Sequence, residues 1–111
     1  MSTSSEYAYT GPDALREVID RALQQVVDPE VAMNIVDVGL VYAIVVEVDN
    51  IHVTMTMTSA ACPVADVIMD DVQSELEVAL PAQFGVEVEL VWEPAWSTER
   101  MSERAKTFMG W

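Results

Sequence analysis

Residues 40–58 read LVYAIVVEVDNIHVTMTMT, and this stretch decides the fold. Its first half is rich in β-branched residues, which favour strands. In its second half, aliphatic residues and methionines alternate with a histidine and threonines, so one face of a strand is apolar and the other polar. Asp49-Asn50 between the halves suits a tight turn, because both residue types tolerate positive φ. We therefore predict a β-hairpin with strands over residues 40–48 and 51–58.

Further elements are expected on both sides of this hairpin. Apolar residues at helical spacing predict helices, and a second alternating run predicts a third long strand. The order α-β-β-α-β-α indicates an α+β fold, a small two-layer sandwich with helices packed on one face of a mixed three- to four-stranded sheet. We expect residues 1–10 to form a flexible N-terminal segment and 11–111 a single domain. The predicted helices cover residues 12–27, 64–80 and 99–109, with Ser97 or Thr98 capping the last, and the strand covers 86–92.

The charge of the chain is strongly negative and unevenly distributed. The 111 residues hold five Lys and Arg against nineteen Asp and Glu, a formal net charge of −14. No Lys or Arg occurs from Ala22 through Glu99. Such a surface repels phosphate backbones and anionic lipids, which argues against nucleic-acid and membrane partners. It suits a basic protein partner, or a host whose proteins are acidic in general.

The sequence also shows no pattern of a membrane span or of a signal peptide. No apolar run approaches the roughly 18 residues of a membrane span, and the first ten residues, MSTSSEYAYT, lack the pattern of a signal peptide. We therefore expect a cytoplasmic protein.

Cys62 is the only cysteine, which excludes a disulfide within one chain. Together with His52 it supplies two metal ligands at most, whereas a structural zinc site takes about four. The two residues also belong to opposite ends of the predicted second strand, roughly 20 Å apart at about 3.3 Å per residue. A hydrogen-bonded Cys–His dyad within one chain is therefore not expected.

Cys62 nevertheless has a position that suits reactivity. It directly precedes Pro63, which opens a predicted helix, and unpaired N–H groups at a helix start stabilise a thiolate. The acidic surroundings oppose this effect, so the direction of the pKa shift stays open. The structural alternative is a small cysteine packed beneath the helix.

Other polar and aromatic residues are candidates for supporting roles. The hydroxyls of Thr58 and Ser59 are suited to bonding a sulfur, a ligand or the helix start. Asp28 and Glu30 flank Pro29, and their carboxylates either lie in water or gather at a site. Asp37 is expected to bond backbone groups in its own loop. Trp92 and Trp96 either clamp the last turn onto the core or form a partner-binding surface, and Met55 and Met57 are expected in the core.

Three segments in order carry a resemblance to a known family: DPEVAMNIVDVGLVY (28–42), MTMTSAACPVADVI (55–68) and VELVWEPAWSTERMS (88–102). Together they resemble the SufT/PaaD-like family, which includes a cytosolic factor that delivers iron–sulfur clusters to target proteins. The resemblance implies a small α/β sandwich. Ala61 and Val31 stand where the family often has Gly and Leu, which leaves the matching positions intact. The functional cluster that the family implies here is Asp28, Glu30, Val31, Thr58, Ser59 and Cys62.

The resemblance also implies a function, an accessory role in iron–sulfur cluster assembly or delivery. The absence of a Cys-rich tail favours the SufT-like branch over the PaaD branch, which assembles an aromatic-ring oxygenase. Cys62 is then a transient ligand of iron or a labile cluster, with further ligands from another chain and no tightly bound cofactor. Expected partners are an iron–sulfur scaffold or apo client proteins, and the chain itself as a homodimer. The alternatives are a metal-free protein-interaction adaptor in the same pathway, a PaaD-like assembly component of an aromatic-ring oxygenase, and a thiol enzyme.

Overall fold

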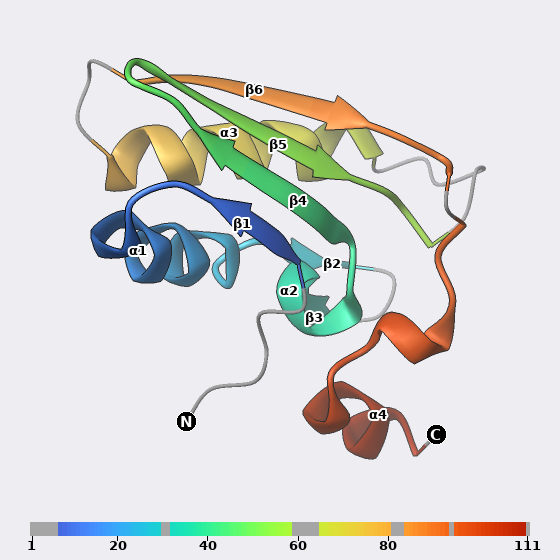
Figure 1. The fold of residues 1–111 in the computed structure, drawn as a ribbon. Coiled ribbons are helices and arrows are strands. Elements are labelled where there is room, and N and C mark those ends of the chain that lie inside the picture. Colours follow the sequence, from blue (N-terminus) through green and yellow to red (C-terminus); the bar gives the residue numbers. More distant parts are fainter. Residues whose placement is uncertain (1–6, 30–31, 59–64, 81–83, 94, 111) are drawn as a thin grey trace.

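The computed structural model of the chain describes residues 7–29, 32–58, 65–80, 84–93 and 95–110. A four-stranded sheet forms one layer, and helices form the other (Figure 1). The elements in chain order are β1 (Ala8–Thr10), α1 (Asp13–Leu23), β2 (Val27–Asp28), β3 (Met33–Asn34), α2 (Ile35–Val38), β4 (Val41–Val46), β5 (Asn50–Met55), α3 (Ala65–Ala79), β6 (Gly85–Leu90), the 3-10 helix η1 (Thr98–Arg100) and α4 (Glu103–Met109).

The sheet has the strand order β1-β4-β5-β6 and is mixed. β4 and β5 form the predicted antiparallel hairpin, in which Val46 lies opposite Ile51 and the N–H of Glu47 donates to the carbonyl of Asn50 (2.7 Å). β1 runs parallel to β4, and β6 runs parallel to β5. A parallel connection needs a long crossover, and α3 belongs to the crossover between β5 and β6.

The core lies between the sheet and the helices α1 and α3, which also pack on each other. The apolar row of β5 faces this core, and Ile51, Val53 and Met55 are completely buried. Ile68, Val72 and Leu76 contribute the matching stripe of α3, whereas the apolar Val67 of the same helix is exposed. The predicted two-layer α+β sandwich is therefore confirmed.

Most differences between the predicted and the observed elements come from short strands, which local sequence patterns do not reveal. Residues 8–10, expected within the flexible segment, instead form β1 and pair with β4. The first helix ends at Leu23 rather than near residue 27, because Val27 and Asp28 form β2. Residues 28–39, expected to be irregular, contain the β2–β3 hairpin and the single turn α2.

The last helix begins later than predicted. Residues 98–100 form η1, and α4 begins after Ser102, whose hydroxyl accepts a hydrogen bond from the N–H of Ala105 (3.1 Å). The cap is therefore Ser102 and not Ser97 or Thr98. Gly110 ends the helix in the left-handed conformation. In the part of the chain that the structure describes, no helix has the length and apolar character needed to cross a membrane.

Candidate functional site

Asp28 ends β2, and its side chain is completely buried. The hairpin that carries it pairs Asp28 with Met33, and the N–H of Ala32 donates to the carbonyl of Asp28 (2.8 Å). Ala32 closes the turn with a φ of +59°, a conformation that non-glycine residues adopt uncommonly. Of the two environments left open for this carboxylate, water is therefore excluded, and Asp28 belongs to the interior.

Two threonines lie beyond β5, and only one of them was a predicted site residue. Thr58 is half-buried. Thr56 was assigned to the polar face, yet it is 1% exposed, and its hydroxyl has no hydrogen-bond partner among the residues that the structure describes. Because a buried polar group normally has a partner, Thr56 is a candidate that the sequence reasoning missed. The repeat TMTMT was the available signal, since it sets Thr56 beside Thr58 in the same alternation.

Three consecutive backbone hydrogen bonds join the segment of Asp28 to the segment of Thr58. The N–H of Ile35 donates to the carbonyl of Val26 (3.0 Å), and the N–H of Leu40 donates to the carbonyl of Ile35 (3.0 Å). The N–H of Thr56 then donates to the carbonyl of Leu40 (2.8 Å). Both motif segments are therefore fastened to α2, which lies with the β2–β3 hairpin at one end of the sheet (Figure 1).

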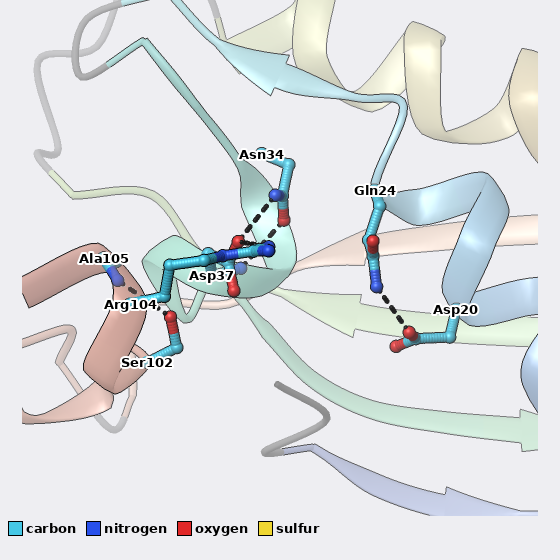
Figure 2. A network of polar contacts seen from close by, with 7 residues as sticks. All are labelled: Asp20, Gln24, Asn34, Asp37, Ser102, Arg104 and Ala105. Atoms are coloured by element: carbon cyan, nitrogen blue, oxygen red, sulfur yellow. Dashed lines mark hydrogen bonds and ion pairs between the residues drawn. The ribbon is translucent and has the colours of Figure 1, made fainter. Parts of the chain in front are cut away.

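Asp37, in the middle of α2, anchors a network of side chains (Figure 2). Its carboxylate accepts a hydrogen bond from Nδ2 of Asn34 (2.8 Å) and pairs with Arg104 of α4. Asn34 also caps α2, since its Oδ1 accepts from the N–H of Asp37 (2.9 Å). The prediction that Asp37 bonds backbone groups is therefore wrong for its carboxylate, which is held by side chains.

The pKa of Asp37 reflects two opposing causes. Burial alone would raise the pKa of this carboxyl group, because it disfavours the charged form. Hydrogen bonds from Arg104 and Asn34 outweigh burial and hold the pKa below its ordinary value. Asp37 is therefore a structural anion rather than a proton donor near neutral pH.

The segment after β6 returns to the same place. Nε1 of Trp96 donates to the carbonyl of Val38 (2.8 Å), and the N–H of Ser102 donates to the carbonyl of Asp37 (2.8 Å). The guanidinium of Arg100 lies 4.2 Å from the ring centroid of Tyr42. These contacts support the interpretation that Trp96 clamps the last turn onto the core, rather than a partner-binding surface.

Trp92 differs from Trp96, because it is 43% exposed. A partner-binding role for Trp92 stays a prediction.

His52 lies elsewhere, on the open face of the sheet. Its Nε2 is 2.9 Å from Oε1 of Glu89, and its Nδ1 is 3.4 Å from Oε1 of Glu87. Hydrogen bonds with Glu89 and then with Glu87 raise the pKa of His52 above its ordinary value. Both ring nitrogens therefore face carboxylates.

Four residues of the predicted cluster, Glu30, Val31, Ser59 and Cys62, lie outside the described residues. Asp28 and Thr58 border the segments that contain them. Within the described part of the chain, no group of three or more His, Cys, Asp and Glu residues is arranged to hold a metal ion. The cluster as a whole therefore stays a prediction from the family resemblance.

The chain matches the sequence model of a known protein family. The sequence model of a family described as iron-sulfur cluster assembly protein matches residues 14–90. The chain belongs to this family. The matched residues include β2, α2, the β4–β5 hairpin, α3 and β6, together with Cys62.

Similar proteins match most of the chain. The chain is 46% identical over 99 residues to the Fe-S protein maturation auxiliary factor YitW of Bacillus subtilis, covering 88% of this chain and 96% of that protein. It is 40% identical over 86 residues to the Fe-S protein maturation auxiliary factor SufT of Staphylococcus aureus, covering 77% and 97%. The resemblance to the SufT-like family is therefore confirmed.

A solved structure supports the fold independently. A domain of unknown function from Bacillus anthracis superposes with a TM-score of 0.83 at 41% identity, covering 88% of this chain and 93% of that one. That protein therefore shares the fold described above.

Proposed function

We propose that this chain is a non-enzymatic accessory factor in iron–sulfur cluster assembly, with Cys62 as a transient ligand of iron or of a labile cluster. The observation that carries the proposal is the position of the only thiol. Cys62 lies within the residues that match the assembly family, between two elements of the fold, β5 and α3. The relatives named auxiliary factors support an assisting role rather than catalysis.

The number of ligands determines what such a factor does. A thiolate binds one iron, and an iron–sulfur cluster needs about four protein ligands. One cysteine therefore fills a single position, and the others come from a second protein: a scaffold, an apo client or another copy of this chain. Ligands shared between two proteins favour transfer over storage, because either side releases the cargo without unfolding.

Described residues of the predicted cluster, and Thr56 beside it in sequence, suit a supporting role for this thiolate. Asp28 is a buried carboxyl group, and Thr56 and Thr58 carry hydroxyls at the end of the segment that leads to Cys62. Hydroxyl donors close to a ligating sulfur stabilise its negative charge and orient it. Glu30 and Ser59 complete the predicted set, with Glu30 orienting the hairpin turn and Ser59 donating to the sulfur.

Anaerobic loading with iron and sulfide, followed by transfer to an apo-ferredoxin, tests the proposal. We expect wild-type protein to accelerate formation of holo-ferredoxin and Cys62→Ser to lose that effect. A double variant, Cys62→Ser with Ser74→Cys, is the matched control, because it keeps one thiol but moves it to the exposed face of α3. The relocated thiol should not restore transfer.

Two results contradict the proposal in different ways. Equal transfer by wild type and Cys62→Ser removes the ligand role and favours the metal-free adaptor. Turnover of a thiol-directed substrate, together with labelling of Cys62 that titrates far below about 8.5, favours a thiol enzyme instead.

A further inference from the structure

β6 forms one edge of the sheet and is six residues long. It pairs with β5 in unbroken register from Gly85 to Leu90, and no described strand lies beyond it (Figure 1). The opposite edge, β1, has only three residues. An edge strand presents a row of backbone N–H and C=O groups that lack partners within the sheet. β6 is therefore the longer and more regular template for an additional strand.

The backbone groups that face this edge follow from the pairing with β5. The N–H of Gly85 donates to the carbonyl of Asp49 (2.9 Å), and the N–H of Val91 donates to the carbonyl of Met55 (2.8 Å). Successive residues of a strand point their backbone groups to opposite sides, so residues 85, 87, 89 and 91 face β5. The N–H and C=O groups of residues 86, 88 and 90 face the open edge.

The helices cover their face of the sheet only partly at β6. Val86, Val88 and Leu90 are half-buried, although Val53, the β5 neighbour of Val88, is completely buried. α3 packs on this face of β6 without covering the apolar row fully. A further strand with aliphatic residues on this face would bury the rest of that row, which would add to the affinity of its backbone pairing.

The open face of β6 carries charge of one sign. Glu87 and Glu89 have side chains 66% and 56% exposed, and their neighbours on β5 are His52 and Thr54, respectively. Soluble proteins commonly protect a sheet edge with charged side chains, above all Lys, or with Pro or a bulge. β6 has no Lys or Pro, and its register with β5 shows no bulge, so Glu87 and Glu89 are its charged residues. A strand added here therefore meets glutamates on one face and aliphatic side chains on the other.

These charges also discriminate between partners. A second copy joined antiparallel through β6 would place Glu87 of one copy against Glu89 of the other, and like charges opposite each other destabilise a strand pair. A basic strand reverses the sign of that interaction. The edge thus disfavours self-association and favours a positively charged segment.

We propose that β6 is a docking edge for an extended segment of a partner protein in which Lys or Arg alternates with aliphatic residues. Backbone hydrogen bonds to residues 86, 88 and 90 supply the pairing, and the alternation supplies specificity. The basic residues lie beside Glu87 and Glu89, and the aliphatic residues lie over α3. This surface goes beyond the proposed function, because it does not depend on Cys62.

A peptide of alternating lysine and valine, blocked at both ends and long enough to span β6, is the probe. We expect the amides of residues 86, 88 and 90 to shift in NMR spectra and to exchange more slowly with solvent when the peptide is present. A peptide of the same composition with its lysines and valines in two blocks tests pattern against charge. An alternating glutamate–valine peptide tests the sign of the charge.

Two variants of the full chain separate pairing from attraction. Val88→Pro removes an N–H that faces the open edge and leaves the ladder to β5 intact, so binding should weaken about fivefold or more, the effect of one backbone hydrogen bond. Glu87→Lys with Glu89→Lys should abolish binding. Asp70→Lys with Asp71→Lys, on the exposed face of α3, changes the net charge equally and should retain most of it.

Three outcomes overturn the proposal. If the peptide with its lysines and valines in two separate blocks binds equally well, the binding is charge attraction alone. If Val88→Pro binds the alternating peptide as well as the wild type does, strand pairing is excluded. A wild-type dimer that dissociates in Val88→Pro assigns the edge to a second copy.

Discussion

Asp37 shows how one residue connects distant parts of the chain. Its carboxylate is only 5% exposed, and a buried charge is tolerated only when it is paired and hydrogen-bonded. Arg104 supplies the pairing from α4, although its own side chain is 71% exposed. Removing Arg104 therefore leaves the charge in place with part of its compensation lost.

The first prediction concerns this pair. Arg104→Ala should lower the free energy of unfolding by about 1–3 kcal/mol, the usual cost of leaving a buried polar group short of a partner. Arg21→Ala is the matched control, because Arg21 pairs with Glu17 on the surface with both side chains mostly exposed. Such a pair contributes about 0–1 kcal/mol. Urea denaturation measures both, and equal losses would contradict the special role of Asp37.

The pH dependence of this loss has a definite sign. The pKa of Asp37 is lower in the folded protein than its ordinary value of 3.8. The stabilisation is therefore present above that value and is lost as the pH falls through the folded pKa. The difference between wild type and Arg104→Ala should narrow in acid, and a difference that stays constant from neutral pH to about pH 2 would exclude ionised Asp37 as its cause.

At the scale of single residues, the sequence analysis missed even a local signal. Asn34 and Asp37 have the spacing of a helix cap, but residues 28–39 were expected to be irregular. Arg104 lies 67 residues from Asp37 in the chain, and nothing in either segment indicates the pairing. The burial of Thr56 was missed for a related reason. Alternation assigns a residue to one face of a strand but does not tell whether the fold covers that face.

At the scale of elements, α2 is the point where the C-terminal segment docks. α2 is a single turn that ends at Gly39 with a φ of +88°. A Cβ atom built on Gly39 would lie 2.2 Å from the carbonyl oxygen of Arg100. A glycine is therefore required at position 39 for two reasons: the left-handed backbone conformation and the close approach of η1.

The second prediction separates these two requirements. Gly110→Ala is the matched variant, because Gly110 has a φ of +78° but no atom within 4 Å of a built Cβ. It should cost only the conformational term, about 1–2 kcal/mol. Gly39→Ala adds the clash with backbone and should cost about twice as much or more.

Urea denaturation measures both losses, and NMR shows where the structure gives way. The indole N–H signal of Trp96 should shift in Gly39→Ala, because that N–H donates to Val38 beside the clash. An unchanged Trp96 signal together with equal stability losses would contradict the close packing of η1 on α2.

Elements were predictable where one local pattern was long enough. The β4–β5 hairpin, α3 and β6 follow from alternation or helical spacing sustained over many residues. β1, β2 and β3 have two or three residues each, and such strands exist only through their partners. α1 stops before the apolar pattern does, because Val26 accepts a hydrogen bond from Ile35 and Val27 pairs with Asn34.

At the scale of the whole molecule, the net charge of −14 acts on every titratable group. His52 is the only histidine, and histidine is the side chain whose unperturbed pKa lies nearest to neutral pH. Its pKa is raised by hydrogen bonds with Glu89 and Glu87, while the field of the whole acidic chain acts in the same direction. These two contributions differ in range, which makes them separable by experiment.

The third prediction is a pKa for His52 above 6.5, measured by NMR titration of its imidazole Cε1 proton. Because the folded pKa is raised, the stabilisation is fully present below the unfolded value and is lost as the pH rises through the folded one. Stability should therefore decline over that interval as His52 loses its proton. His52→Gln should remove this part of the pH dependence.

Charge-matched variants then assign the cause of the raised pKa. Glu87→Gln with Glu89→Gln removes the contacts at 3.4 Å and 2.9 Å, whereas Asp70→Asn with Asp71→Asn removes equal charge from the exposed face of α3. Salt screens distant charges, with a Debye length of about 10 Å at 0.1 M, but acts weakly on groups in contact. If the contacts dominate, only the glutamate variant lowers the pKa strongly, and added salt changes the wild-type value little. Equal effects of both variants, abolished by salt, would instead make His52 a reporter of the charge of the whole molecule.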